Sequence, residues 1–578
     1  MKHLLSILFA AAAIATAMAT TVSAQTQNIQ LPVSGNPEIT YGEAVSRHEF
    51  GIDTGIFRSP DGSLLAVYKK DESRVTNFPL LDISTRTGSL ISIKYPMNGM
   101  ASEHISLCIC DTLGNIRCEI VPTEFTEERY LTQVCWSPDS RYIFIQVLSR
   151  TQHDMHLNMY RASDGSFVRT LLTEHNDAWT EPQDILRPIP GSADYIYTTD
   201  NRDGYRSLYR IDTLGNIKRL TCVDADVEFA ATDGRRLYYT SAEVSPIENH
   251  LFCLDLRKPS RRAVRLTPES GWHSITVAED CRSFEDKWSS LDEPATTVRR
   301  STADGSILEV IKPASEKLKG KARPEISLSS FKSADGAFDN YYRFVKPMNF
   351  DPSKKYPLVV YVYGGPHSQM VQNAWNGRMR KIEELLSAKG IACFSIDGRG
   401  TDNRGAAYEK AINRQCGKVE MEDQIAALKA LLTENPWIDA SRVGVAGWSY
   451  GGFMTISLIT HYPGYFKAAA CGGPVIDWKW YEVMYGERYM DTPETNPEGF
   501  ASTTLMGRAG DVKCPLLICQ GMIDDTVLPI NSLSFTQECV EKGVQLDYFP
   551  YPRSEHNVKG AWRQHLYDKF VEFLTGNL

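Results

Sequence analysis

The chain has 578 residues, of which 42% are hydrophobic and 23% are charged. These fractions are ordinary for globular proteins, so they exclude a disordered or fibrous chain, and the length predicts roughly two to four domains. The 62 basic and 71 acidic residues give a formal net charge of −9. A chain without a basic surplus is not expected to bind nucleic acid.

Residues 1–24 are predicted to be a signal peptide. A polar start at Lys2 precedes the apolar run LLSILFAAAAIATAMA, and small residues (VSA) stand just before Gln25. This order is typical of a cleaved export signal, and an uncleaved membrane anchor is the alternative. We therefore expect an exported protein that is periplasmic, attached to the cell surface or extracellular.

Residues 25–324 are predicted to form short β-strands that recur with their turns. Aromatic and β-branched residues alternate with polar ones in segments such as RSPDGSLLAVYK, CWSPDSRYIFIQVLS and TDGRRLYYTSAE. The hexapeptide DTLGNI occurs at 111–116 and again at 212–217, about 100 residues apart, which is about two units of the size of a propeller blade. We predict a partial β-propeller of about five blade units. An irregular β-sandwich is the alternative, but it would not explain the repeat.

From residue 325 the pattern changes to alternating strands and helices. Apolar runs of strand length lie at 357–364, 390–400, 442–449 and 515–521, with helical stretches such as EDQIAALKALLTENP between them. This alternation is typical of a parallel sheet with helices on both faces. Residues 325–578 are therefore predicted to form a doubly wound, mostly parallel α/β domain, whose first strand is the run 357–364.

Residues 447–451 form a G-x-S-x-G motif centred on Ser449. The motif follows the apolar strand RVGVA and precedes the helix-like FMTISLITHYP. A serine between a strand and a helix, flanked by glycines, is typical of the nucleophile elbow of an α/β-hydrolase, in which the N–H of the next residue binds the oxyanion. Ser449 is thus the predicted nucleophile, and Tyr450 supplies the predicted backbone donor.

A serine nucleophile needs a base and a carboxylate that orients the base. Of the three histidines that follow Ser449, His556 stands in the loop SEHN after the strand-like LDYFPYP, whereas the other two lie in helical segments. For the acid, Asp524 in the turn GMIDDTV is favoured because it follows the strand PLLICQG, and Asp525 beside it is the alternative. We predict a Ser-Asp-His triad.

Several of these motifs resemble one known family. GWSYGG, DGRG and ERYM are similar to motifs of the prolyl oligopeptidase superfamily, in its dipeptidyl peptidase IV branch. YVYGGPHSQ, NRGAA, GGPVIDW, YEVMYGERY and SEHNV resemble the bacterial prolyl tripeptidyl peptidases of that branch, and the likeness continues upstream in YGEAVSRHEFGI and LTPESG. The resemblance implies an eight-bladed propeller that caps an α/β-hydrolase domain.

The resemblance also implies an activity. Members of the branch are secreted serine exopeptidases that release dipeptides or tripeptides after proline, from oligopeptides with a free N-terminus, and need no metal or organic cofactor. Residue by residue, it implies that Ser449 is the nucleophile, Asp524 the orienting acid and His556 the base. Tyr363 in YVYGGP would complete the oxyanion hole with its hydroxyl.

The segment DWKWYEVMYGERY is expected to bind substrate. Its aromatic residues and Glu482 fall at helical spacing, on one stripe that holds Trp478, Tyr481, Glu482, Tyr485 and Tyr489. Such a stripe alone is more often core than pocket. The resemblance implies that Tyr481 and Tyr485 form an aromatic box for the substrate proline, with Val475 and Val527 as its apolar walls. It also implies that Glu482 and Glu49 are the carboxylates that bind the terminal ammonium.

Two features depart from the family pattern. Thr526 stands where dipeptidyl enzymes have an asparagine that binds a substrate carbonyl, which favours tripeptide release. Only about fifteen residues separate the predicted signal peptide from YGEAVSRHEFGI, so the first blades of the propeller are expected to be missing. Open strand edges would then favour pairing with another chain, as in a homo-oligomer.

Three functions follow from these features. The leading hypothesis is a serine exopeptidase that cleaves after proline, with tripeptide release favoured over dipeptide release. An esterase or acylaminoacyl peptidase on the same fold is the second hypothesis, and Glu482 and Glu49 argue against it. The third is a peptide-binding or interaction protein that has no catalytic activity because its propeller is shortened.

Overall fold

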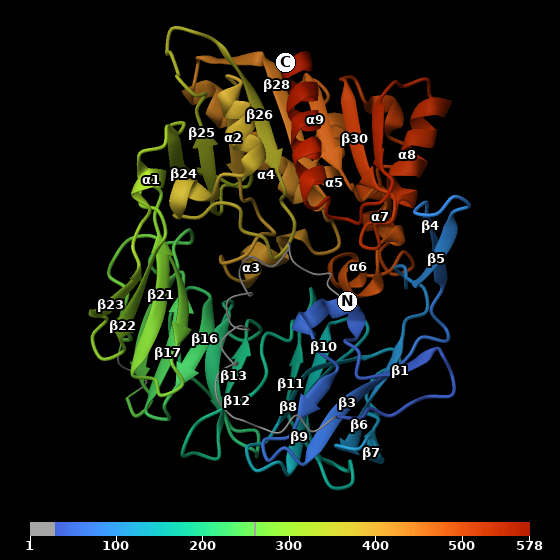
Figure 1. The fold of residues 1–578 in the computed structure, drawn as a ribbon, viewed down its shortest axis with the longest axis vertical. Coiled ribbons are helices and arrows are strands. Elements are labelled where there is room, and N and C mark those ends of the chain that lie inside the picture. Colours follow the sequence, from blue (N-terminus) through green and yellow to red (C-terminus); the bar gives the residue numbers. More distant parts are fainter. Residues whose placement is uncertain (1–28, 259–261) are drawn as a thin grey trace.

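The computed structural model describes residues 29–258 and 262–578, which form a blade domain and a catalytic-type α/β domain (Figure 1). The predicted signal peptide, 1–24, lies outside the described residues. Within the part of the chain that is described, no helix has the length and apolar character needed to cross a membrane.

The blade domain consists of five antiparallel sheets that follow one another in chain order. The first sheet holds β1 (Ile39–Tyr41), β2 (Ile56–Arg58), β3 (Leu64–Asp71), β6 (His104–Asp111) and β7 (Ile116–Ile120). The second holds β8 (Tyr130–Trp136), β9 (Tyr142–Leu148), β10 (Asp154–Arg161) and β11 (Phe167–His175). The third holds β12 (Arg187–Pro188), β13 (Tyr195–Thr199), β14 (Ser207–Ile211) and β15 (Ile217–Arg219).

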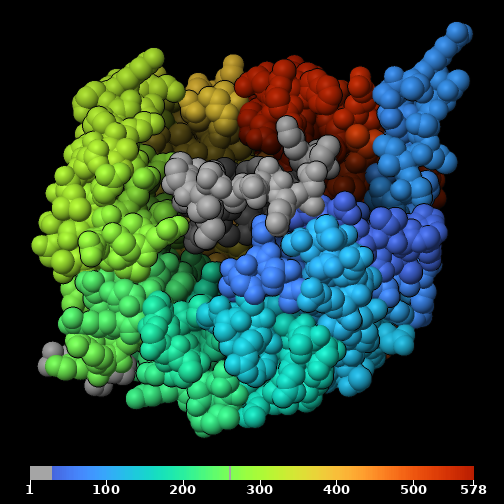
Figure 2. All heavy atoms as spheres, turned by 60° about the horizontal axis from the view of Figure 1, so that its bottom comes forward, coloured from blue at the N-terminus to red at the C-terminus, as the bar shows by residue number. Residues whose placement is uncertain are grey.

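The fourth sheet holds β16 (Val227–Thr232), β17 (Arg236–Ser241), β18 (His250–Asp255) and β19 (Val264–Arg265). The fifth holds β20 (Trp272–Val277), β21 (Ser283–Ser289), β22 (Thr296–Ser301) and β23 (Ile307–Lys312). In Figure 2 the parts of the chain that hold these sheets follow one another in an arc, from blue to yellow-green. The predicted partial propeller is confirmed.

The repeated hexapeptide DTLGNI forms the same turn in two blades. It links β6 to β7 in the first sheet and β14 to β15 in the third. In each copy the aspartate Oδ1 accepts hydrogen bonds from two backbone N–H groups of the turn: Leu113 and Asn115 donate to Asp111, and Leu214 and Asn216 donate to Asp212. One blade lies between the copies, which accounts for their spacing of two units.

The α/β domain is built on one eight-stranded sheet with the order β24-β25-β27-β26-β28-β29-β30-β31. Its strands are β24 (Ile326–Lys332), β25 (Asp339–Val345), β26 (Tyr356–Val362), β27 (Ala392–Ile396), β28 (Ile438–Trp448), β29 (Ala468–Gly472), β30 (Leu516–Gly521) and β31 (Asp547–Tyr551). β25 pairs antiparallel with β24 and β27, and the pairs from β27 to β31 are parallel. The first strand was therefore predicted too late, because the alternating polar residues of β24 and β25 do not form an apolar run.

Helices cover both faces of this sheet, as predicted. The α-helices from residue 316 onward are α1 (Glu316–Lys319), α2 (Lys381–Ala388), α3 (Ala406–Glu409), α4 (Lys418–Glu434), α5 (Tyr450–His461), α6 (Val483–Met490), α7 (Pro497–Thr503), α8 (Ile530–Glu541) and α9 (Ala561–Asn577). On one face, Leu386 of α2 packs in a cluster with Phe570 of α9, and on the other, Leu428 of α4 packs in a cluster with Ile456 of α5.

The blades contact the α/β domain at the start of α6. The hairpin of β4 (Asn77–Asp82) and β5 (Ser89–Lys94) rises from the first blade beside the α/β domain (Figure 1). The chain after it pairs with the segment before α6: the N–H of Asn98 donates to Tyr481 O at 2.8 Å, and the N–H of Val483 donates to Pro96 O at 3.0 Å. Val483 and Met484 are buried in the core of the blades. The predicted substrate segment is thus fixed by both domains.

Candidate active site

Ser449 occupies a tight turn between β28 and α5. Its backbone has φ 63° and ψ −121°, a conformation that residues other than glycine rarely adopt. A Cβ on Gly447 would lie 2.2 Å from Gly451 O, and a Cβ on Gly451 would lie 2.3 Å from Val362 O. The two glycines of the motif are therefore required for the strand and helix to approach so closely. This is the geometry predicted for a nucleophile elbow.

The predicted oxyanion donors lie just beyond the ends of two neighbouring strands. Tyr363 follows β26 and Tyr450 follows β28, and their ring centroids are 6.2 Å apart. Burial raises the pKa of the Tyr363 hydroxyl to about 12, so the hydroxyl stays protonated at neutral pH and can donate a hydrogen bond. Tyr450 is the first residue of α5, where backbone N–H groups have no partner within the helix. Both donor types that the sequence predicts are therefore available.

Asp524 and His556 are in direct contact. Asp524 Oδ2 lies 2.7 Å from His556 Nδ1, and its Oδ1 accepts hydrogen bonds from the N–H groups of Thr526 and Val527 at 2.9 Å. The Nε2 atom of His556 is buried and has no hydrogen-bond partner among the described residues. Asp525, the alternative acid, is exposed. The geometry favours Asp524 as the group that orients His556.

Ser449 and His556 are brought together through residues 472–473. The N–H of Ser449 donates to Gly472 O at 2.8 Å. A Cβ on Gly473 would lie 3.1 Å from His556 Cε1 and 3.6 Å from Asp524 Oδ2. Trp448, next to Ser449, also donates from Nε1 to His556 O at 3.1 Å. The three predicted triad residues therefore surround one backbone segment.

The predicted aromatic box forms a continuous cluster. The rings of Tyr481 and Tyr485 are 5.1 Å apart and lie edge to face, and the ring of Trp478 lies 5.7 Å from Tyr481 and 6.0 Å from Tyr485. Tyr450 is 5.5 Å from Trp478, so the cluster extends to the elbow. Aromatic faces of this kind suit the rigid apolar ring of proline. Val475 and Val527 lie in the same core cluster and are fully buried.

The prediction that this segment forms one continuous helix is wrong. Residues 478–480 form one short 3-10 helix, and α6 starts only at Val483, with Glu482 as its N-cap. Glu482 accepts hydrogen bonds of 2.9 Å from the N–H groups of Met484 and Tyr485. A carboxylate at this position satisfies free N–H groups of the helix, and helical spacing alone does not reveal such a break.

Glu482 is a buried acid beside a second carboxylate. It is 5% exposed, and burial together with the charge of Glu49 raises its pKa to about 8. Glu49 lies in the loop of residues 46–51 in the blade domain, and its Oε2 is 3.3 Å from Nη2 of Arg488. The blade domain and the α/β domain thus each supply one carboxylate, as the family resemblance implies for an ammonium site.

Two further residues at this site were not predicted from the sequence. Arg47 donates to Asp525 O at 2.6 Å and lies 4.7 Å from the ring of Tyr95, and its charge lowers the pKa of Glu482. Glu420 accepts a hydrogen bond from the hydroxyl of Tyr450. Arg47 lies in the same SRHEFGI motif as Glu49, so this motif could have indicated Arg47 as a residue of the site. Glu420 lies next to the EDQI segment, and no pattern in the sequence links it to Tyr450.

Two family profiles match the chain. Residues 378–578 match the prolyl oligopeptidase family, and residues 20–295 match the dipeptidyl peptidase IV (DPP IV) N-terminal region. Mouse (Mus musculus) dipeptidyl peptidase 8 is 25% identical over 583 residues, which cover 87% of this chain. The chain spans 65% of the length of that relative.

Solved structures share the fold over most of the chain. A proposed dipeptidyl aminopeptidase IV from Bacteroides ovatus ATCC 8483 is 35% identical, with a TM-score of 0.89, over 94% of this chain and 80% of that chain. Dipeptidyl peptidase 4 from Porphyromonas gingivalis is 26% identical, with a TM-score of 0.87, over 94% of this chain and 77% of that chain. The likeness spans both domains.

Proposed function

Because the chain belongs to the dipeptidyl peptidase IV family of serine peptidases, we propose that it is an exopeptidase that releases dipeptides or tripeptides from free N-termini by cleaving after proline. The observation that carries the exopeptidase part is the pair of carboxylates at Glu482 and Glu49. A buried carboxylate would bind the terminal ammonium of a peptide, whereas a blocked N-terminus would leave the charge unpaired.

The chemistry is that of an acyl-enzyme. Ser449 Oγ attacks the carbonyl carbon of the substrate proline, and His556 Nε2 takes the hydroxyl proton while Asp524 holds the Nδ1–H. The N–H of Tyr450 and the hydroxyl of Tyr363 bind the oxyanion. His556 then gives the proton to the leaving amine. In the second half, water attacks the acyl carbon while His556 takes a proton from the water. The bond between the acyl carbon and Ser449 Oγ then breaks, and His556 returns the proton to Oγ.

Positioning follows from the same residues. The proline ring packs against Tyr481, Tyr485 and Trp478, which costs little conformational entropy because the ring is rigid. Glu482 and Glu49 bind the ammonium group of the substrate N-terminus, which lies beyond the proline ring. The number of residues between the ammonium and the scissile bond then decides between dipeptide and tripeptide release. Thr526 supports tripeptide release, whereas the names of the similar proteins support dipeptide release.

The test compares chromogenic anilides of Gly-Pro and Ala-Ala-Pro, each with a free and an acetylated N-terminus, using residues 25–578. We expect release of chromophore from a free-amine substrate and none from its acetylated form. Ser449→Ala is the control and should abolish both turnover and labelling by a fluorophosphonate. Faster turnover of the acetylated substrates would instead favour an acylaminoacyl peptidase. Labelling that persists in Ser449→Ala would overturn the assignment of the nucleophile.

Export is a further part of the proposal. It rests on the apolar run and the small residues before Gln25. Mass spectrometry of the protein purified from the source cell should find Gln25 as the first residue, in a periplasmic, surface or extracellular fraction. A mature chain that retains residues 1–24 in the cytoplasm would contradict export.

A further inference from the structure

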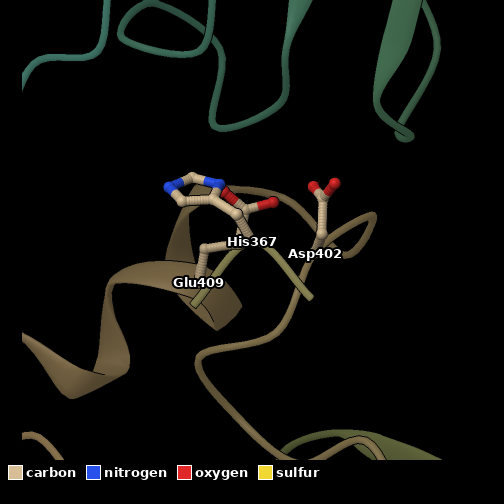
Figure 3. A group of neighbouring side chains, drawn as sticks. All are labelled: His367, Asp402 and Glu409. Carbon is tan, nitrogen blue, oxygen red and sulfur yellow. The ribbon is translucent and has the colours of Figure 1, made fainter. Parts of the chain in front are cut away.

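A second cluster of ionisable side chains lies outside the candidate active site, where the α/β domain faces the blades. His367 lies in the loop after β26, Asp402 in the loop after β27, and Glu409 at the end of α3. One potential ligand atom from each of the three lies within 4.8 Å of the other two. Figure 3 shows the three side chains extending from the α/β domain into the space below the blade loops.

The surroundings of this cluster carry an excess of negative charge. The blades add the carboxyl groups of Asp226 and Glu228, and one guanidinium, that of Arg206, which lies 3.2 Å from Asp402 Oδ1. Lys410 is also close, but it pairs with Asp200 at 2.6 Å. Burial raises the pKa of Glu409, Asp226 and Glu228. Buried carboxylates in such excess are compensated either by protons or by a bound cation.

Glu409 is the member that most needs a partner. It is 9% exposed, and among the described residues the side-chain hydrogen bond of its carboxyl group is with the carboxyl group of Asp402. Asp402 also accepts from the N–H of Asn403 at 2.7 Å and from Arg206. Two carboxyl groups in contact and buried beside an imidazole are costly unless a cation or proton neutralises them.

We propose that His367, Asp402 and Glu409 bind a divalent transition-metal ion of the Zn²⁺ class. One imidazole with two carboxylates is a ligand set that such ions take, whereas Mg²⁺ and Ca²⁺ prefer oxygen ligands alone. Bonds of about 2.0–2.2 Å in a tetrahedral site place ligand atoms roughly 3.3 Å apart. Ligand atoms that already lie within 4.8 Å reach this spacing by small side-chain rotations.

His367 is oriented as a metal ligand would be. Its Nε2 lies 3.2 Å from Glu181 Oε2, within ion-pair distance but without the geometry of a hydrogen bond, and its other ring nitrogen, Nδ1, lies on the side of Glu409 (Figure 3). An ion bound at Nδ1 would leave the ring proton on Nε2, beside the Glu181 carboxylate. The side chain of His367 is 30% exposed, so an ion can reach the site from solvent.

The ion would have a structural role. It would join the loop after β26 to the loop after β27 and hold both against Glu181 and Arg206 of the blades. The sequence analysis predicted no metal site, because the three ligands come from separate segments without metal-binding spacing. The proposed ion does not take part in the reaction at Ser449.

The test measures Zn²⁺ binding to the chelator-stripped, full-length protein. Competition with a chromophoric chelator should show one tightly bound Zn²⁺ per chain, and the thermal unfolding midpoint should rise with Zn²⁺ concentration. His367→Gln and Glu409→Gln should each weaken binding at least about tenfold, and Glu181→Gln about ten- to a hundredfold. Fluorophosphonate labelling at Ser449 confirms that each variant is folded.

His175 offers a matched control. It contacts Asp154 at 2.8 Å and Asp177 at 3.1 Å on the exposed surface, so His175→Gln removes a histidine with two acidic neighbours and should leave tight Zn²⁺ binding unchanged. Equal affinity in the wild type and His367→Gln would overturn the proposal. So would the absence of Zn²⁺ binding together with a loss of stability as pH rises, because protons would then neutralise the cluster.

Discussion

Glu420 accepts a hydrogen bond of 2.5 Å from the hydroxyl of Tyr450, the residue whose backbone N–H is the proposed oxyanion donor. Burial raises the pKa of Glu420 to about 7, and its carboxylate also accepts from the N–H of Gly417 at 2.9 Å. The side chain of Tyr450 is therefore anchored to α4, while its N–H remains available at the elbow.

Removal of this hydroxyl tests the anchor. Tyr450→Phe leaves a buried carboxyl group without one donor, so we expect the free energy of unfolding to fall by about 1–3 kcal/mol. The backbone N–H is retained, so kcat should fall less than about tenfold. Urea unfolding and steady-state kinetics measure the two effects. Tyr462→Phe, on a half-buried surface tyrosine, is the control, and an equal loss of stability there would contradict a specific role for the Glu420 contact.

The adjacent aspartates after β30 provide a matched pair. Asp524→Asn places an amide against His556 Nδ1 and favours the wrong tautomer, so we expect kcat to fall by a factor on the order of 10³–10⁴. Asp525→Asn changes an exposed side chain and should leave kcat within about twofold. Both are measured with the free-amine anilides. A comparable loss in Asp525→Asn would show that the acid has been misassigned.

Glu482 makes stability depend on pH. Its pKa is raised to about 8 from 4.5 by burial and by Glu49, so between these values the folded protein holds a proton that the unfolded chain has released. The contribution of protonated Glu482 to the free energy of unfolding is complete below about pH 4.5, and it is lost as pH rises through about 8. Glu482→Gln should therefore become more stable relative to the wild type as pH rises from 5 to 8.

Thermal unfolding midpoints at several pH values measure this difference. Glu494→Gln, on an exposed side chain nearby, is expected to follow the wild type at every pH. A constant difference between Glu482→Gln and the wild type would show that Glu482 does not change its protonation in this range.

Glu103 positions the loop that carries Glu49. The N–H of Ser46 donates to Glu103 Oε1 at 2.5 Å. The backbone of this loop is strained, because four of its residues other than glycine have φ between 50° and 68°: Ser46, Arg47, His48 and Phe50. Glu103→Ala should loosen the loop and raise KM for free-amine substrates about tenfold, with kcat within about twofold.

Glu103→Gln retains an acceptor and should restore most of the affinity. Glu72→Ala removes a carboxylate that pairs with Lys70 at 3.1 Å in the same region, and it should leave KM unchanged. A parallel fall in kcat for Glu103→Ala would instead indicate general disruption of the fold.

The fold was predictable from the sequence, and candidates for the triad could be proposed, because their signals are local. Ser449 lies between an apolar strand and a helix, and the acid and base positions follow from strands that come later in the chain. β24 and β25 were missed because polar residues interrupt their apolar residues, as they do in the strands of the blades. The N-cap role of Glu482 was missed because helical spacing is the same whether a helix starts before or after it.

Residues whose role depends on distant partners could not be predicted. Arg47 contacts the backbone of Asp525, and Arg488 contacts Glu49, across hundreds of residues. The cluster of His367, Asp402 and Glu409 requires two loops and α3 to be brought together by the sheet and by the blades. The SRHEFGI motif marks the segment that holds Arg47 and Glu49 but not the distant residues that they contact.

The pairing of residues 96–98 with residues 481–483 would link substrate selection, as proposed above, to the relative placement of the domains. Ser449, Asp524 and His556 all follow strands of one sheet, whereas the two carboxylates that we propose to bind the ammonium belong to different domains. A small hinge motion between the domains would separate Glu49 from Glu482 and leave the triad intact. Such a motion would release a bound N-terminus without disturbing the nucleophile, and it would give the blades control over substrate residence time.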